Sequence, residues 1–216
     1  MAEINLLKSL PKSKRNVKNR KIKKTTKHIK IAKKFGKMFF DGPREYGYGG
    51  YSYDGRWQPV ARDICEHFKL KKDDKFLDIG CAKGFLVKDM LRLGIDSYGI
   101  DISDYAVKNA EKETFGRLHK GSAILLPFPN NAFDCVVSIN TLHNFKKKDF
   151  IIALKEMIRV GKKSFFIQVD SYFNDLQKKK CEDWILTAEY HDYPEEWIKL
   201  FNKAGYKGDW YWTIME

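Results

Sequence analysis

The chain has 216 residues, of which 43% are hydrophobic and 14% aromatic, enough to bury one sizeable core in a single domain. No apolar run reaches the roughly eighteen residues that a membrane-spanning helix needs, and no secretory leader pattern is present, so we expect a cytoplasmic protein without a membrane span. No C-x-x-C pair occurs, which favours reduced thiols over disulfides or zinc at Cys65, Cys81, Cys135 and Cys181.

The whole net charge of +13 belongs to the first 37 residues, which hold fourteen Lys and Arg and one acid, Glu3. Basic runs at residues 12–15 and 18–24 predict a basic, partly disordered arm over residues 1–37. Such an arm can bind an anionic partner, or it can be a solvated segment that aids solubility; both readings stay open. Helical spacing at the end of the arm predicts docking on the domain through Ile31, Phe35, Met38 and Phe39.

Residues 38–57 combine glycines with tyrosines and follow neither a helical nor an alternating period, which predicts a loop. Tyrosine rings stack on bases or sugars and donate their hydroxyls, so we interpret this loop as a flap over a cofactor or acceptor. Its candidate substrate-binding residues are Tyr46, Tyr51, Tyr53 and Arg56. A loop that only packs across the sheet, and an ordinary surface ion pair for Arg56, are the alternatives.

From Gln58 onward, helical and strand-like patterns alternate, which predicts one α/β domain over residues 58–216. Strands are expected at residues 75–79, 97–102, 118–121, 133–139, 164–169 and 210–214. Helices are expected at residues 59–68, 85–94, 104–115, 147–160, 174–188 and 194–201. The predicted fold is Rossmann-like and doubly wound, with a mostly parallel sheet and helices on both faces. Whether residues 185–190 add a further strand stays open.

A glycine turn after the first strand indicates a nucleotide site. Apolar residues run into Asp78, and Gly80 and Gly84 free the backbone where the next helix begins. The second strand ends in Asp101, twenty-one residues after Gly80, the separation expected of an acid that binds ribose hydroxyls. A dinucleotide fingerprint would need glycine at the positions of Ala82 and Phe85, so NAD is not favoured.

The segment from Asp78 to Gly84 resembles the first motif of class I S-adenosylmethionine-dependent methyltransferases, with Ala82 at its middle glycine. Residues 126–138 resemble the post-ribose segment of the type 11-like subgroup that includes quinone-biosynthesis enzymes. The resemblance implies S-adenosylmethionine as cofactor, with Ser122 where the family often has an aspartate. The implied cofactor-binding residues are Asp78, Gly80, Cys81, Gly84, Asp101, Ile102, Ser122, Ala123 and Asn140.

The acceptor side rests on residues that follow the fourth and fifth strands. His143, with an ordinary pKa of about 6.5, is the candidate general base, and a histidine that only bonds a loop is the alternative. Asp170 is the second catalytic candidate, and Asn144 and His191 are candidate acceptor contacts. No residue cluster has metal-ligand spacing, so no metal is expected.

These features predict an enzyme that methylates a small molecule, on oxygen. The tyrosine-glycine loop, the His143 region and residues 205–212 look similar to bacterial methyltransferases tied to sugar or surface-polysaccharide decoration. Nucleic acid is disfavoured, because the Asn/Asp-Pro-Pro-aromatic motif is absent after the fourth strand and residues 38–216 are neutral overall. An RNA methyltransferase guided by the arm and a non-catalytic scaffold with a nucleotide fold are the alternatives.

Overall fold

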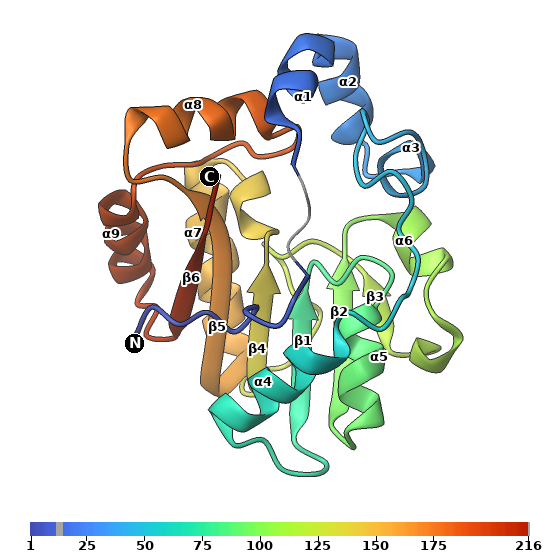
Figure 1. Cartoon of the computed structure of the whole chain (residues 1–216). Coiled ribbons are helices and arrows are strands. Elements are labelled where there is room, and N and C mark those ends of the chain that lie inside the picture. The colour runs from blue at the N-terminus through green and yellow to red at the C-terminus, as the bar shows by residue number, and fades with distance from the viewer. Residues whose placement is uncertain (12–14, 216) are drawn as a thin grey trace.

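The computed structural model describes residues 1–11 and 15–215, so the basic run that begins at Lys12 lies outside the described residues except for Arg15. One six-stranded sheet has the order β3-β2-β1-β4-β5-β6, with every neighbouring pair parallel (Figure 1). The strands are β1 (Lys75–Ile79), β2 (Asp96–Asp101), β3 (Leu118–Lys120), β4 (Phe133–Ile139), β5 (Gly161–Ser171) and β6 (Asp209–Ile214). The predicted Rossmann-like, doubly wound fold is confirmed.

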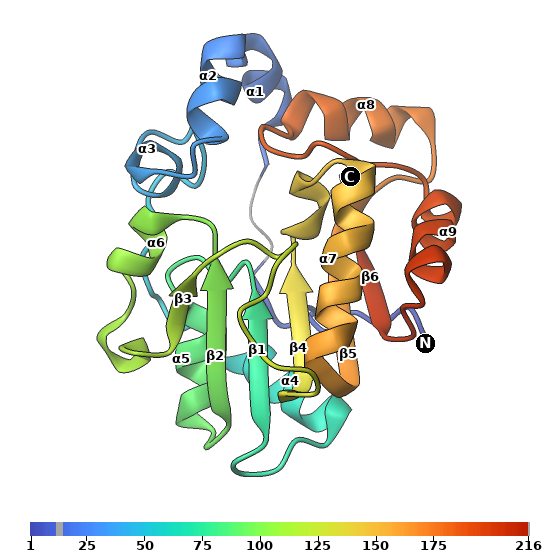
Figure 2. The same cartoon turned by 180° about the vertical axis from the view of Figure 1, so that it is seen from behind.

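Helices cover both faces of the sheet (Figures 1 and 2). Helices α4 (Gln58–Phe68) and α5 (Phe85–Arg92) pack on one face, around Phe76 and Phe166. Helices α7 (Lys147–Val160) and α9 (Pro194–Ala204) pack on the other, around Leu77 and Val136. The central strands β1 and β4 are buried on both faces, which is why they read as continuous apolar runs.

Several elements differ from the expectations. The helix expected at residues 174–188 ends at Trp184, because Ile185 is extended, and the strand expected at residues 164–169 runs from Gly161 to Ser171. The helix expected at residues 104–115 splits into α6 (Asp104–Lys108) and the 3-10 turn η1 (Lys112–Thr114), because Glu111 is extended and its carboxylate reaches Lys88 Nζ on α5 at 2.6 Å. Residues 185–190 form no strand, and β6 pairs directly with β5. Among the described residues the sheet is therefore all parallel and has no antiparallel closing strand.

The arm and the start of the flap form three short helices above the carboxyl ends of the strands, where the sequence predicted a partly disordered arm (Figure 1). They are α1 (Val17–Lys23), α2 (Thr26–Ala32) and α3 (Lys37–Phe40), and α1 packs against α8 (Asp175–Trp184). Asn16 and Thr25 cap the first two helices by accepting hydrogen bonds from backbone amides. Within the described part of the chain, no helix has both the length and the apolar character to cross a membrane.

The N-terminal segment starts at the edge of the sheet, beside β6, and then crosses toward α4 (Figure 1). The Ile4 amide donates to the Trp210 carbonyl at 2.8 Å, and the Trp210 amide donates to the Ala2 carbonyl at 3.0 Å. Leu6 and Leu7 are then buried in the apolar cluster under α4. This segment therefore protects the edge of β6 and contributes to the core.

Candidate functional site

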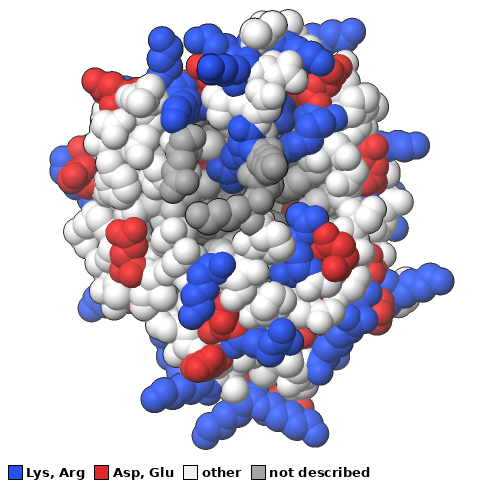
Figure 3. Space-filling model, in the orientation of Figure 1, with Lys and Arg blue, Asp and Glu red and all other residues white. Residues whose placement is uncertain are grey.

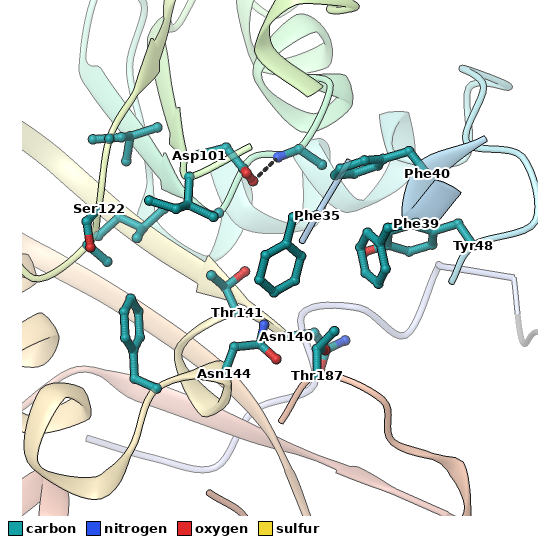
Figure 4. Close-up of a pocket in the computed structure, with 18 residues that line it drawn as sticks. Phe35, Phe39, Phe40, Tyr48, Asp101, Ser122, Asn140, Thr141, Asn144 and Thr187 are labelled. Carbon is teal, nitrogen blue, oxygen red and sulfur yellow. Dashed lines mark hydrogen bonds between the residues drawn. The ribbon is translucent and has the colours of Figure 1, made fainter. Parts of the chain in front are cut away.

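A pocket with about 940 Å³ of empty space, counted out to its open mouth, lies at the carboxyl ends of β1, β2 and β4. This is where the strand order reverses, the usual ligand position in open α/β sheets. Its walls come from strand ends, from the 3-10 turn η2 (Leu142–Asn144) and from the arm (Figure 4). The pocket is lined by Phe35, Phe39, Phe40, Tyr48, Ile79, Gly80, Ala82, Ile100, Asp101, Ile102, Gly121, Ser122, Ala123, Asn140, Thr141, Asn144, Phe145 and Thr187.

The turn after β1 brings bare backbone to the pocket. Gly80 has φ +85°, and a Cβ there would clash with the side chain of Thr141. Ala82 keeps a side chain at φ +51°, a left-handed conformation that costs an L residue about 1–2 kcal/mol. This conformation lets the Ala82 amide donate to Asp101 Oδ2 at 2.8 Å.

Asp101 ends β2 with a fixed carboxylate. Its Oδ1 accepts from the Ser103 amide at 2.8 Å, and its Oδ2 accepts from the Ala82 amide (Figure 4). Each oxygen retains a lone pair for a ligand, the arrangement that two ribose hydroxyls require. Burial raises the pKa of Asp101, and the two amides lower it in part. Burial and the nearby Asp101 raise the pKa of Asp78 to about 7.

Six of the nine residues expected to bind cofactor line the pocket: Gly80, Asp101, Ile102, Ser122, Ala123 and Asn140. Asp78, Cys81 and Gly84 do not. Asp78 is buried on β1, and the Cys81 side chain packs against Gly99 of the neighbouring strand. Gly84, at φ +75°, starts α5, and a Cβ there would lie 2.8 Å from Leu118. These three residues shape the turn from behind the pocket wall.

Aromatic residues of the arm and flap form the opposite wall. Phe35 points into the pocket from the arm, and Phe39, Phe40 and Tyr48 lie beside it (Figure 4). The helical spacing of Phe35 and Phe39 was the sequence signal for this contact. Nothing local distinguished Tyr48 from the other tyrosines of the flap.

The four flap residues singled out from the sequence lie outside the pocket lining. Tyr46 stacks on His28, and Tyr51 stacks on Phe85 with ring centroids 4.6 Å apart. The Tyr53 hydroxyl donates to Asp89 Oδ1 at 2.5 Å. Arg56 pairs with Asp54 at the surface, as its alternative reading had it.

Lys83 ties the flap to the nucleotide turn. Its Nζ donates to both carboxylate oxygens of Asp41, at 2.8 and 2.7 Å, and to the Tyr51 carbonyl at 2.9 Å. The side chain is buried, so this lysine has a structural role that its position in the glycine turn did not suggest.

His143 and Asp170 lie beside the pocket without lining it. The buried His143 ring accepts a hydrogen bond at Nδ1 from the Asp170 amide at 3.1 Å, which leaves the proton of the neutral ring on Nε2. The Nδ1 lone pair, the one with which a neutral imidazole could accept a proton, is therefore already used in this hydrogen bond. The Asp170 carboxylate lies 3.7 Å from the same nitrogen. This geometry matches the loop-bonding alternative better than the general base.

Asn144 lines the pocket as expected, and its side-chain oxygen is buried with no hydrogen-bond partner among the described residues. His191 lies elsewhere: its Nδ1 is 3.3 Å from the Tyr172 hydroxyl, and burial lowers its pKa. Over residues 1–11 and 15–215, no three His, Cys, Asp or Glu side chains gather as a metal site. Besides Tyr48, the polar side chains that line the pocket are those of Asp101, Ser122, Asn140, Thr141, Asn144 and Thr187.

Residues 77–167 match the family model described as the methyltransferase domain. The demethylmenaquinone methyltransferase of Geobacillus stearothermophilus is 33% identical over 110 residues, which cover 47% of this chain and 46% of that protein. The ubiquinone biosynthesis O-methyltransferase of Pelagibacter ubique is 24% identical over 151 residues, 65% of this chain and 60% of that protein. Residues 77–167 therefore form a domain similar to class I S-adenosylmethionine-dependent methyltransferases.

Solved structures agree on the fold of this methyltransferase domain. The YcgJ protein of Bacillus subtilis superposes with a TM-score of 0.55 at 19% identity, over 67% of this chain and 66% of that one. The [4+2]-cyclase SpnF superposes with a TM-score of 0.55 at 20% identity, over 73% and 61%. Identities this low show the fold alone, and SpnF is named for a reaction other than methyl transfer. The chain spans 46% of the length of the demethylmenaquinone methyltransferase. One fold can carry several different reactions, so the reaction has to be argued from the site.

The cofactor of this family is S-adenosylmethionine, and the residues of the methyltransferase domain fit it. Asp101 presents two fixed acceptor oxygens for a ribose, and Gly80 leaves no side chain between the turn and the pocket. Apolar walls at Ile102 and Phe145 suit an adenine ring. A sulfonium centre is a cation, and the acids Asp78 and Asp101 favour positive charge nearby.

Proposed function

We propose that this chain is an enzyme that transfers a methyl group from S-adenosylmethionine to the oxygen of a small molecule, a sugar or related precursor. The observation that carries the cofactor half is the Asp101 carboxylate, held by two amides where β1 and β2 end beside Gly80. The small-molecule half is supported by the aromatic wall, which encloses the pocket on the side of the arm.

The names of the relatives support the same acceptor class. The demethylmenaquinone methyltransferase and the ubiquinone biosynthesis O-methyltransferase are both named for small molecules. The polar acceptor end of this pocket, with Asn144 and Thr187, favours an acceptor that carries hydroxyl groups. We propose that the sugar is methylated in the cytoplasm as a precursor for surface-polysaccharide decoration. This setting rests on the resemblance drawn from the sequence.

When bound, S-adenosylmethionine supplies an electrophilic methyl group whose departure leaves a neutral thioether. The residues of this chain therefore have to align the acceptor and exclude water, and alignment alone can supply several kcal/mol. Phe35 and Tyr48 close the pocket on the side of the arm. Asn144 can orient an acceptor hydroxyl through its unpartnered side-chain oxygen.

Calorimetry with S-adenosylmethionine tests the cofactor half. The full chain should bind the cofactor, and no heat of binding at millimolar concentration would leave only a scaffold with a nucleotide fold. The acceptor half is tested by S-adenosylhomocysteine production with nucleotide sugars, sugar phosphates, free sugars, phenols and transcripts. Turnover with a sugar supports the proposal. Turnover confined to phenols or to transcripts overturns the acceptor that we propose.

A further inference from the structure

A second cleft, with about 670 Å³ of empty space, lies between α1 and α8, outside the methyl-transfer pocket. Lys and Arg side chains gather around α1 and α2 at the top of the molecule (Figure 3). The lining of this arginine cleft includes four cations, one acid and one indole: Arg20, Lys23, Lys24, Arg44, Glu45 and Trp184. Neither the family match, which begins at residue 77, nor the proposed reaction accounts for it.

Three guanidinium groups surround one indole. The Cζ atoms of Arg20, Arg44 and Arg15 lie 4.6, 5.2 and 5.8 Å from the centroid of Trp184. Contacts of this kind hold planar cations in place while their N–H edges stay available to a ligand. The cluster therefore has an ordered geometry and is more than a run of solvated charges.

These cations are short of negative partners. Among the described residues, no carboxylate lies within 4.0 Å of a nitrogen of Arg15, Arg20 or Arg44. Arg20 is only 9% exposed, and its guanidinium donates to one carbonyl, that of Glu45, at 3.0 Å. The Glu45 carboxylate faces His28, 3.7 Å away.

The neighbouring positive charge and the burial of Arg20 also change its pKa. Burial, and then the neighbouring Arg44, lower the pKa of Arg20 to about 10. A cation held away from water without a counter-charge is destabilising, and an anion that binds beside it relieves that cost. Asp183 on α8 does not fill this role, because its carboxylate pairs with Lys21.

We propose that the arginine cleft binds a phosphate or diphosphate group of a small molecule. Arginine forks bind phosphate oxygens at two points, and lysines such as Lys23 add charge at the rim. The small, concave shape favours a compact anion over a nucleic-acid strand, which needs a charged surface several phosphates long. Residues 38–216, which contribute most of the surface, are neutral overall.

Two stretches of chain connect the cleft to the methyl-transfer pocket, although the two linings have no residue in common. Arg44 donates to the Gly47 carbonyl, next to Tyr48 of the pocket. Lys24 Nζ donates to the Ile185 carbonyl at 3.0 Å, two residues before Thr187 of the pocket. The phosphate therefore comes either from the methyl acceptor itself, a reading that rests on the proposed function, or from a separate small anion.

Titration calorimetry with inorganic pyrophosphate on the full chain tests whether the cleft binds a phosphate group. The most specific test compares the wild type with a variant whose charge is reversed at the rim of the cleft. Lys23 is exposed, so Lys23→Glu should leave the fold intact and weaken pyrophosphate binding at least tenfold. Lys27→Glu makes the same change on α2, outside the lining, and should bind like the wild type. Equal loss in both variants, or no pyrophosphate binding to the wild type, overturns the proposal.

Arg20→Gln and Arg44→Gln should weaken pyrophosphate binding by tenfold or more, and Arg62→Gln on α4 is the matched control. S-adenosylmethionine binding, measured on the same samples, reports an intact fold and tests the proposed function separately. An oligonucleotide without terminal phosphates that displaces pyrophosphate through its backbone would overturn the preference for a small molecule. Turnover of a sugar phosphate but not of the matching free sugar assigns the phosphate to the acceptor; equal turnover of both assigns it to a separate anion.

Discussion

Asp101 has its orientation set by the backbone, because both carboxylate oxygens accept hydrogen bonds from amides of adjacent turns. Asp101→Asn removes the negative charge and turns one acceptor into a donor that faces an amide. We expect S-adenosylmethionine to bind about 10- to 150-fold more weakly, the effect of losing charge-assisted hydrogen bonds worth about 1.5–3 kcal/mol. Titration calorimetry measures this loss. Asp104→Asn, on an exposed side chain three residues on, is the control, and equal affinities in the two variants would remove Asp101 from the site.

Asp78 makes the stability of the ligand-free protein depend on pH. Its pKa of about 7 lies above the ordinary value of about 3.9, so the folded state binds the extra proton and stability falls as pH rises from about 4 to about 7. The fall amounts to at most about 4 kcal/mol at 1.36 kcal/mol per pKa unit.

Asp78→Asn should flatten this part of the profile, as measured by urea denaturation at pH 4.5 and pH 7.5. Asp73→Asn, on an exposed turn before β1, keeps the wild-type slope if the assignment to Asp78 is correct. A slope that persists in Asp78→Asn would locate the titration elsewhere.

His143 differs from a general base in a way that two substitutions resolve. Its Nδ1 accepts the Asp170 amide proton, and a glutamine oxygen can replace that acceptor without being able to take up a proton near neutrality. His143→Gln should therefore retain turnover and its pH profile. His143→Ala leaves a buried amide unpaired and should lose about 1–3 kcal/mol of stability in denaturant titrations. If His143→Gln binds S-adenosylmethionine normally and loses turnover, the general-base assignment is right.

At the scale of elements, local pattern was enough wherever the apolar period of an element is complete. Strands β1 and β4 and helix α7 begin and end at the predicted residues, because their apolar periods are uninterrupted. The apolar period after Ser103 did not predict that the helix splits at Glu111, because the cause is a tertiary contact with Lys88. The sequence left open whether residues 185–190 add a strand, and the structure forms none there.

The part of the site that lies on two adjacent strands was predictable from local sequence, and the part that comes from the arm and flap was not. The glycine turn and Asp101 follow one another along two adjacent strands, so spacing alone locates them. The aromatic wall comes from another part of the chain, and which tyrosine faces the pocket is decided by packing. Tyr51 turns away to stack on Phe85, and Tyr48 takes the position in the lining.

Lys83 links two elements, the nucleotide turn and the flap, and its removal should loosen the aromatic wall. Lys83→Met retains the buried stem and deletes the three hydrogen bonds to Asp41 and Tyr51. We expect weaker cofactor binding, by about tenfold, and faster amide exchange at residues 38–57. Lys108→Met, which breaks an exposed pair with Asp104, is the control. Unchanged exchange in the flap of Lys83→Met would contradict the link.

At the scale of the whole molecule, the segment before the basic arm belongs to the core. Leu6 and Leu7 are 4% and 8% exposed and pack under α4, while Ala2 and Ile4 bond to Trp210 at the sheet edge. Leu6→Ala should lower the free energy of unfolding by about 2–4 kcal/mol, the cost of a cavity in a packed cluster. Lys8→Ala, two residues on and exposed, should change it by less than about 0.5 kcal/mol.

Urea denaturation followed by circular dichroism measures both variants, and equal midpoints would mean that the segment does not contribute to the core. The same packing bears on truncation experiments. Deletion of residues 1–37 removes Leu6 and Leu7 from the core and Phe35 from the pocket, in addition to fourteen cations. Loss of turnover in such a truncation would therefore not identify RNA as the acceptor. The charge reversal at Lys23 changes the arginine cleft while leaving those contacts in place, so it separates a role for charge from a role for packing.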